Sequence, residues 1–420
     1  MLDVRGFRGV RFDPGVVGSL DSVITPPYDV ITPEERRELA RRSPYSMAHL
    51  ILPEARAGLT GYAVAARDLA AWVAQGVLKQ DPVPYFYVLE QTFLDPQGVE
   101  HVRRGFLGVA RVPEPGDISI LGHEQTFPNI VEDRLRLTEA MRANLGPVFV
   151  LYSDADGRLA SFLDQARERP PAMVARTIDG VTQQVWCVPH TDAVTAFFKD
   201  KRLYIADGHH RFRAACAYRD RMRAAAGSAR RDLSPSYEYV LMGFVALSDP
   251  GLHIYPTHRL LRMPRGFQVD RFLSDAAKWF AVTPAAERLA ETVAAQPGCA
   301  FGIVIRGAGQ YLLALRDIDR VAFLGPERGA AWRDLDVAVL HRGVVERIMG
   351  LPAETYFVYE RDASRVLAAV DGGEYGLGFI LKATTGDQIR ACAEAGESMP
   401  HKSTYFFPKL PSGAVLHFLF

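Results

Sequence analysis

Midway along the chain, an apolar run enters a polar cluster and reads Tyr204-Ile205-Ala206-Asp207-Gly208-His209-His210-Arg211. The segment 201–206 predicts a strand, and the Ala- and Arg-rich segment 212–226 predicts a helix. A turn between a strand and a helix N-terminus directs backbone N–H groups toward an anion, and a glycine lets the backbone approach closely. We therefore expect this turn to bind phosphate through Gly208, His209, His210 and Arg211.

Asp207 stands at the start of the same turn, where it can orient a histidine or hold a metal that the phosphate also contacts. It is the expected metal ligand, and with His209 it is a candidate catalytic residue. The alternative is a tight turn before a solvated basic helix. Two adjacent histidines, an arginine, a glycine and an aspartate directly after an apolar strand favour the functional interpretation.

The rest of the chain predicts a mixed α/β (α+β) fold. Thr32, Pro33 and Glu35 form a helix start with a capping box, and 59–77 predicts a second helix. The segments 85–93 and 103–112 predict a hairpin, and 237–247 predicts a buried strand. A polar Gly, Ser and Pro segment at 227–236 suggests a linker. We therefore expect a catalytic domain over residues 1–236 and a second α/β domain over 237–420 that completes the site.

Four further polar segments offer candidate site residues. His123-Glu124-Gln125-Thr126 precedes a segment with Arg134, and Glu124 can take a proton from a hydroxyl or hold Mg²⁺. Asp29, in Pro26-Pro27-Tyr28-Asp29, is a second candidate base. Cations and hydroxyls follow at His258, Arg259, Lys402, Ser403, Thr404 and Tyr405, and they suit an anion such as a pyrophosphate or an amino-acid carboxylate. The alternative for each is a surface loop or turn.

Asp207-Gly208-His209-His210-Arg211-Phe212-Arg213-Ala214-Ala215 resembles the nucleotide-phosphate motif of the ParB/sulfiredoxin superfamily, and its free-serine kinases carry the most similar version. The motif lacks the cysteine of sulfiredoxins, and no helix-turn-helix of the ParB type follows it. The resemblance implies a ParB/sulfiredoxin-like N-terminal core.

Five blocks together resemble one long bacterial and archaeal family, first catalogued as a domain of unknown function: this motif, 25–31, 123–126, 256–259 and 399–409. Some of its members are pyrophosphate-dependent serine kinases. The resemblance covers essentially the whole chain and implies a kinase that makes O-phospho-L-serine from L-serine and inorganic pyrophosphate, with Mg²⁺ as cofactor. In that interpretation Arg259 and Lys402 bind phosphate, and His123, Thr126, Arg134, His258, Ser403, Thr404 and Tyr405 bind substrate.

Composition limits the classes of partner that this protein is expected to bind. Lys+Arg and Asp+Glu both number 49, so no global basic field recruits nucleic acid or a membrane surface. The N-terminus lacks an apolar signal core, no run is long enough to span a bilayer, and the four cysteines are far apart. We expect a cytoplasmic enzyme of small molecules, with no nucleic-acid or membrane partner. The oligomeric state is left open.

Three other functions remain compatible with the sequence. The donor can be ATP or ADP, which an apolar slot beside the phosphate turn would favour. Water can replace the serine hydroxyl, which would give a phosphatase. A non-enzymatic nucleotide sensor of the ParB type is the third, although the neutral charge and the lack of a DNA-reading motif oppose it.

Overall fold

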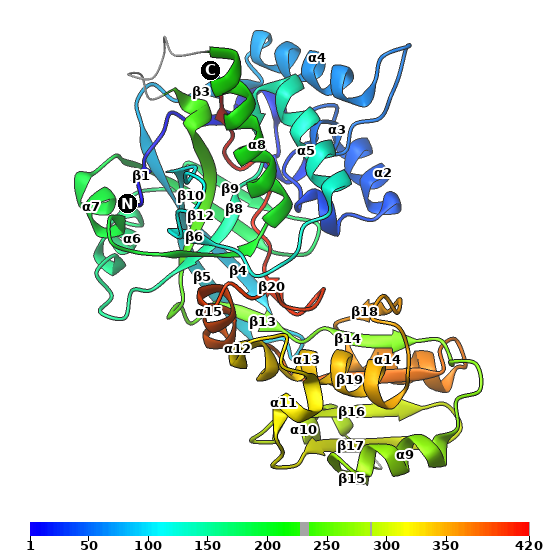
Figure 1. Ribbon diagram of the computed structural model, residues 1–420. Coiled ribbons are helices and arrows are strands. Elements are labelled where there is room, and N and C mark those ends of the chain that lie inside the picture. The colour runs from blue at the N-terminus through cyan, green and yellow to red at the C-terminus, as the bar shows by residue number, and fades with distance from the viewer. Residues whose placement is uncertain (227–234, 286–287, 420) are drawn as a thin grey trace. The chain divides into compact units, whose positions relative to one another are not determined.

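The computed structural model describes residues 1–226, 235–285 and 288–419, and it is an α+β protein, as the sequence predicts (Figure 1). The chain forms two compact units. Unit 1 comprises Met1–Gly122, Thr126–His253 and Pro408–Phe420, and unit 2 comprises His123–Gln125 and Ile254–Phe407. Each unit has its own sheet and hydrophobic core.

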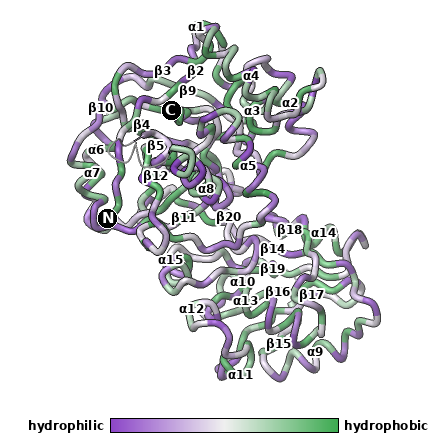
Figure 2. The backbone as a smooth tube through the Cα atoms, turned by 45° about the horizontal axis from the view of Figure 1, so that its top comes forward, coloured by the Kyte–Doolittle hydropathy of each residue, from purple (hydrophilic) through white to green (hydrophobic). Residues whose placement is uncertain are grey.

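Unit 1 is built on a nine-stranded mixed sheet whose main path runs β6-β11-β8-β12-β5-β4-β10-β9, and the ninth strand, β1 (Val4–Arg5), pairs with β5. The path ends with β10 (Thr182–Pro189) and β9 (Met173–Arg176). Strands β4 (Tyr85–Leu94) and β5 (Glu100–Arg111) form the expected hairpin. Strand β12 (Tyr239–Ala246) is apolar along most of its length (Figure 2) and lies between β5 and β8 (Val148–Tyr152). Strand β11 (Leu203–Asp207) pairs with β8 and with β6 (Ile120–Leu121). The sheet thus places the end of β11 near its edge.

Helices cover this sheet and anchor the phosphate turn. Helix α8 (His209–Ala226) follows β11 and packs against α5 (Pro128–Met141), and α5 packs against α4 (Gly61–Ala74). Phe212 and Ala215 of α8 contribute to the main core, whereas Ala214 and Tyr218 pack with Leu135 of α5. Burial on two sides therefore fixes the direction of α8. Helix α2 (Pro33–Arg42) begins with the predicted capping box of Thr32 and Glu35.

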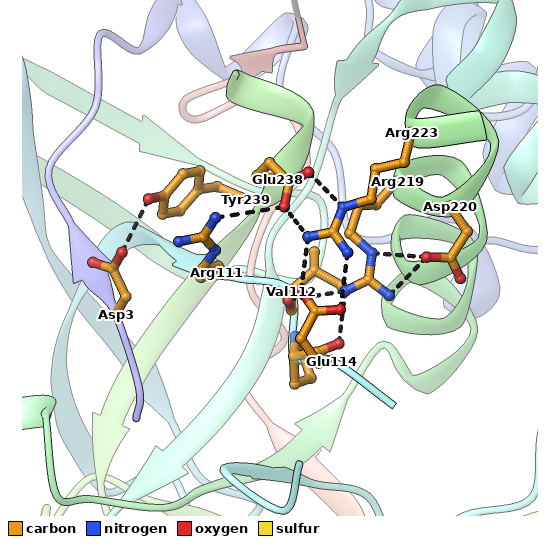
Figure 3. Close-up of polar contacts among 10 residues, drawn as sticks. Asp3, Arg111, Val112, Glu114, Arg219, Asp220, Arg223, Glu238 and Tyr239 are labelled. Carbon is orange, nitrogen blue, oxygen red and sulfur yellow. Dashed lines mark hydrogen bonds and ion pairs between the residues drawn. The ribbon is translucent and has the colours of Figure 1, made fainter. Parts of the chain in front are cut away.

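Charged contacts fix the far side of α8 against the sheet (Figure 3). Arg219 is fully buried and donates to the carbonyl oxygens of Val112 at 3.0 Å and Pro113 at 2.7 Å. One turn later, Arg223 contacts both Glu114 and the buried Glu238. Because a buried arginine needs its donors satisfied, these contacts hold α8 in one position along the sheet.

Unit 2 has a six-stranded sheet in the order β15-β17-β16-β19-β14-β18, in which β15 is Phe280–Ala285, β17 is Gly309–Leu315 and β18 is Val358–Glu360. Its central strands are β16 (Ala300–Ile305), β19 (Leu377–Leu381) and β14 (His258–Leu261). Helices α10 (Leu289–Ala294) and α14 (Ala363–Asp371) pack on one face of this sheet and enclose an aliphatic core. A π-helix, η5 (Val339–Ile348), packs with α9 (Val269–Ala277).

The predicted domain boundary between residues 236 and 237 differs from the observed division. Strand β12 completes the sheet of unit 1 between β5 and β8, and residues 408–420 return to unit 1. Sequence order hides both facts, because the pairing partners of these segments lie far away in the chain. Most of the predicted linker, 227–234, lies outside the described residues. Among the helices that the structure describes, none is long and apolar enough to cross a membrane.

Candidate functional site

The turn at Asp207–Arg211 has the strand–turn–helix geometry that the sequence predicts. Gly208 has φ +90°, a conformation that residues with a Cβ rarely adopt. A Cβ built at this position would lie 2.9 Å from Nε of Arg211. Helix α8 begins at His209, so the three basic side chains stand in its first turn, where backbone N–H groups lack acceptors within the helix. The turn therefore offers an anion both N–H donors and the positive end of a helix.

Two cations hold the carboxylate of Asp207. Its Oδ2 accepts from Arg211 Nη2 at 2.6 Å, and its Oδ1 accepts from Lys409 Nζ. The three side chains are only 9 to 14 % exposed. Burial alone would raise the pKa of Asp207, but Lys409 and Arg211 outweigh that effect and lower this pKa below its ordinary value. Asp207 is therefore an anion at neutral pH, and the cluster of three carries a net positive charge.

A cavity of about 60 Å³ lies beside Arg211 in unit 1. Arg211 also donates to the carbonyl oxygen of Pro147, which keeps its guanidinium at the cavity wall. Opposite polar walls come from Tyr28 and Arg134, and the Arg134 guanidinium lies 4.3 Å from the centre of the Tyr28 ring. Burial, followed by the charge of Asp29, raises the pKa of Tyr28 to about 12, so its hydroxyl stays protonated. Most remaining walls are apolar, with residues such as Ile51, Leu145 and Val148.

The two adjacent histidines, His209 and His210, differ in burial and in their contacts. His209 is 4 % exposed, and burial lowers its pKa to about 3, so it is neutral at physiological pH. The helix turn points this ring into the protein, and the phosphate-binding role expected for His209 stays a prediction. His210 is partly exposed, and its Nε2 accepts from the backbone N–H of Phe127 at 3.1 Å. The His210 ring also stacks on the Phe127 ring, so it links the turn to the start of α5.

Unit 1 brings together three of the sequence blocks. Thr25 exchanges backbone hydrogen bonds with Ser412, which places the Thr25–Ile31 segment beside the C-terminal segment that carries Lys409. Lys409 in turn reaches Asp207. Asp29 follows Tyr28 and is exposed, and Arg134 donates to the carbonyl oxygen of Ile51 at 2.7 Å. Thr126 also belongs to unit 1 and is partly exposed.

Unit 2 brings together the 256–259 block, most of the 399–409 block and the start of the His123 segment. The carbonyl oxygen of His123 accepts from Met399 N at 2.8 Å, and His123 Nε2 lies 3.4 Å from the Thr404 hydroxyl. Arg259 is fully buried and donates to the carbonyl oxygen of Lys402 at 3.0 Å. His258 is buried and accepts from Leu381 N, and burial lowers its pKa to about 4. Glu124 belongs to this unit as well.

The Lys402–Tyr405 loop divides its side chains between surface and interior. Lys402 is exposed with φ +53°, whereas Ser403 and Thr404 are buried. The Ser403 hydroxyl donates to the carbonyl oxygen of Pro400, and the Tyr405 ring lies 4.4 Å from the Arg361 guanidinium. Of this loop, only Ser403 faces the larger pocket of unit 2 described below. The roles expected for these residues stay predictions.

Sequence reasoning missed two residues of the unit 1 site. Lys409 was visible only as the last residue of a recognised block, and nothing in its neighbours indicates an ion pair with a residue 202 positions away. Tyr28 looked like a core residue, yet it lines the cavity between two arginines. For Lys409, the available signal was its position between two prolines at the end of an apolar segment. A lysine buried there would need a carboxylate partner.

The donor set of this site does not match a preformed magnesium site. Mg²⁺ is usually held by one or two carboxylates together with substrate phosphates. Both oxygens of Asp207 already contact cations. Within residues 1–226, 235–285 and 288–419, no group of three or more His, Cys, Asp or Glu side chains is arranged to hold a metal. Any Mg²⁺ would therefore depend on oxygens that a phosphate ligand brings.

Comparison with known proteins establishes the family. Residues 4–338 match the model described as “Protein of unknown function (DUF1015)”, and the chain belongs to this family. No curated protein matches the chain.

Three solved structures are similar to it in part. A conserved hypothetical protein from Pyrococcus furiosus is 15 % identical, with 70 % of this chain and 90 % of that chain covered and a TM-score of 0.34. A free serine kinase in complex with AMP is 14 % identical, with 72 % and 88 % covered and a TM-score of 0.35. SbnI with a C-terminal truncation, from Staphylococcus aureus, is 13 % identical, with 72 % and 84 % covered and a TM-score of 0.35. Such TM-scores support no inference about function.

Proposed function

We propose that this protein is a phosphotransferase that makes O-phospho-L-serine from free L-serine, with inorganic pyrophosphate as the phosphate donor. The observation that carries the proposal is the turn at Asp207–Arg211, where a glycine with φ +90° leads into a long helix beside two buried cations. Its sequence resembles the phosphate motif of free-serine kinases. The choice of serine as acceptor rests on that resemblance alone.

The chemistry assigned to this site is positioning and charge stabilisation. The N–H groups at the start of α8 hold the donor, and the net positive charge of Arg211, Lys409 and Asp207 attracts it. The serine hydroxyl oxygen attacks the terminal phosphorus while the bond to the leaving phosphate breaks. A carboxylate takes the hydroxyl proton, and Asp29 and Glu124 both remain candidates. His209 is neutral and buried, so its part is to support the turn.

The size of the unit 1 cavity supports a small donor. Its volume of about 60 Å³ suits a phosphate group better than a nucleoside, and Arg211 is the residue of the turn that lines it. Mg²⁺ belongs to the proposal as a companion of the donor, where it would neutralise phosphate charge. No step is assigned to it, because Asp207 is already paired with two cations.

One observation favours a second candidate, an ATP- or ADP-dependent serine kinase. The cavity wall beside Arg211 is mainly aliphatic, as an adenine ring would require. Side chains at this wall would have to move to admit a base, whereas pyrophosphate needs no such opening. The two candidates thus differ in whether a nucleoside contributes to binding.

A donor comparison tests the proposal. The purified chain is incubated with L-serine, Mg²⁺ and either pyrophosphate, ATP or ADP, and phosphoserine is measured by mass spectrometry. Phosphoserine with pyrophosphate alone supports the first candidate, and formation with ATP or ADP alone supports the second. Phosphate release without phosphoserine indicates a phosphatase, and tight nucleotide binding without turnover indicates a sensor. Either of these last outcomes overturns the kinase assignment.

A further inference from the structure

A separate polar pocket of about 320 Å³ lies within unit 2. It is framed by the start of β14, the loop after β19 and the segment before the π-helix η5. Its polar walls come from Thr257, Arg259, Asp336, Lys382, Thr384 and Ser403. This volume falls in the range of sites for small ligands.

The guanidinium of Arg259 gives the pocket lining a positive charge that no nearby carboxylate balances within the portion of the chain that the structure describes. Arg259 is 1 % exposed, and among the described residues no carboxylate lies within ion-pair distance of it. Its Nη atoms donate to backbone carbonyl oxygens, but its Nε has no hydrogen-bond partner in the described parts of the chain. The hydroxyl of Thr257, two residues earlier, is likewise buried without a partner there. A buried guanidinium in this state is a strong recognition element for a carboxylate.

The pocket lining also includes the recessed carboxylate of Asp336. Asp336 is 15 % exposed at its side chain, and its Oδ2 lies 3.4 Å from Lys382 Nζ without accepting a hydrogen bond from any described residue. Lys382 directs its hydrogen bonds to the carbonyl oxygens of Gln296 and Gly298 instead. Burial raises the pKa of Asp336 and outweighs the opposing effects of Lys382 and Cys299. An added ammonium group would complete its contacts.

We infer that this pocket binds a small α-amino acid, with its carboxylate on Arg259 and Thr257 and its ammonium group on Asp336. A buried guanidinium and a recessed carboxylate line one small cavity, and this is the pattern that recognises a zwitterion. A simple anion would leave Asp336 unsatisfied and would be repelled by it. The inference concerns binding alone, so it does not rest on phosphoryl transfer.

Ligand chemistry provides the test, through calorimetric titration of the full chain. L-Alanine is the probe, because it has both charges and no hydroxyl to phosphorylate. L-Lactate, ethylamine and inorganic phosphate each lack one feature that the pocket requires. We expect L-alanine to bind and the other three to bind at least tenfold more weakly. Phosphate or lactate binding as tightly as alanine would overturn the inference, as would no binding of alanine.

A matched pair of variants locates the binding site. Asp336→Asn removes the recessed charge, whereas Asp334→Asn makes the same chemical change at an exposed residue of the same pocket, 64 % exposed and paired with Arg320. We expect Asp336→Asn to weaken L-alanine binding at least tenfold and Asp334→Asn to leave it unchanged. Thr257→Val, which removes only the buried hydroxyl, is the second variant should Asp336→Asn unfold. Unchanged alanine affinity in a folded Asp336→Asn or Thr257→Val variant would contradict the inference.

Discussion

Substituting Asp207 by Asn tests whether the buried charge cluster is organised around this carboxylate. The substitution keeps the shape of the side chain but leaves the ammonium of Lys409 and the guanidinium of Arg211 side by side without an anion. Removing one partner of a buried ion pair costs about 3–5 kcal/mol. The two charged hydrogen bonds lost, at about 1.5–3 kcal/mol each, lead to a similar range. We therefore expect the free energy of unfolding of unit 1 to fall by about 3–5 kcal/mol.

The assay is urea unfolding followed by hydrogen exchange in strands β8 and β11, which report on unit 1. Glu34→Gln is the matched control, because this carboxylate pairs with Arg37 at the surface, where both side chains are more than 60 % exposed. The control should change the free energy of unfolding by less than about 1 kcal/mol. If Asp207→Asn is as mild as the control, the cluster is not held by a buried carboxylate and this reasoning fails.

Three further predictions address the turn and its supports. Gly208→Ala should lower the free energy of unfolding by about 1–3 kcal/mol and weaken pyrophosphate binding, because φ is +90° and the added Cβ meets Arg211. Gly58→Ala is the control, because Gly58 has φ +79° but open space around it. Equal losses for the two variants in urea titrations would refute the contact argument. Because His209 has a pKa of about 3 when folded and an ordinary value of 6.5 when unfolded, the stability from its neutral form is complete above pH 6.5 and is lost as pH falls toward 3. Between pH 7.5 and pH 5, the free energy of unfolding measured in urea should therefore fall less for His209→Asn than for the wild type. An equal fall contradicts this. In the contacts of Figure 3, Glu238→Gln should cost about 1–3 kcal/mol, and Glu114→Gln, at a carboxylate 58 % exposed, should cost less than about 1 kcal/mol; thermal unfolding that ranks them the other way would contradict the role given to the buried carboxylate.

Local signals predicted most elements of the fold. The capping box at Thr32 and Glu35, the apolar run of β12 and the turn after β4 each depend on residues near one another in the chain, and all three are confirmed. The division into units was not predictable in this way. It depends on which strands pair, and β12 joins unit 1 through partners about 90 to 140 residues earlier.

The candidate site was likewise predictable only where its residues are neighbours in the sequence. The turn at Asp207–Arg211 was predictable, because strand, glycine and helix start follow one another directly. The partner of Asp207 was not, since Lys409 reaches it from the far end of the chain. The neutral state of His209 was also hidden, because it arises from burial that only the packed structure reveals.

A crystal structure of the chain grown with pyrophosphate and L-serine tests the central claim most directly. The account predicts pyrophosphate oxygens within about 3 Å of the backbone N–H groups of His209 and His210. Pyrophosphate bound only elsewhere, for example at Arg259 in unit 2, would contradict it.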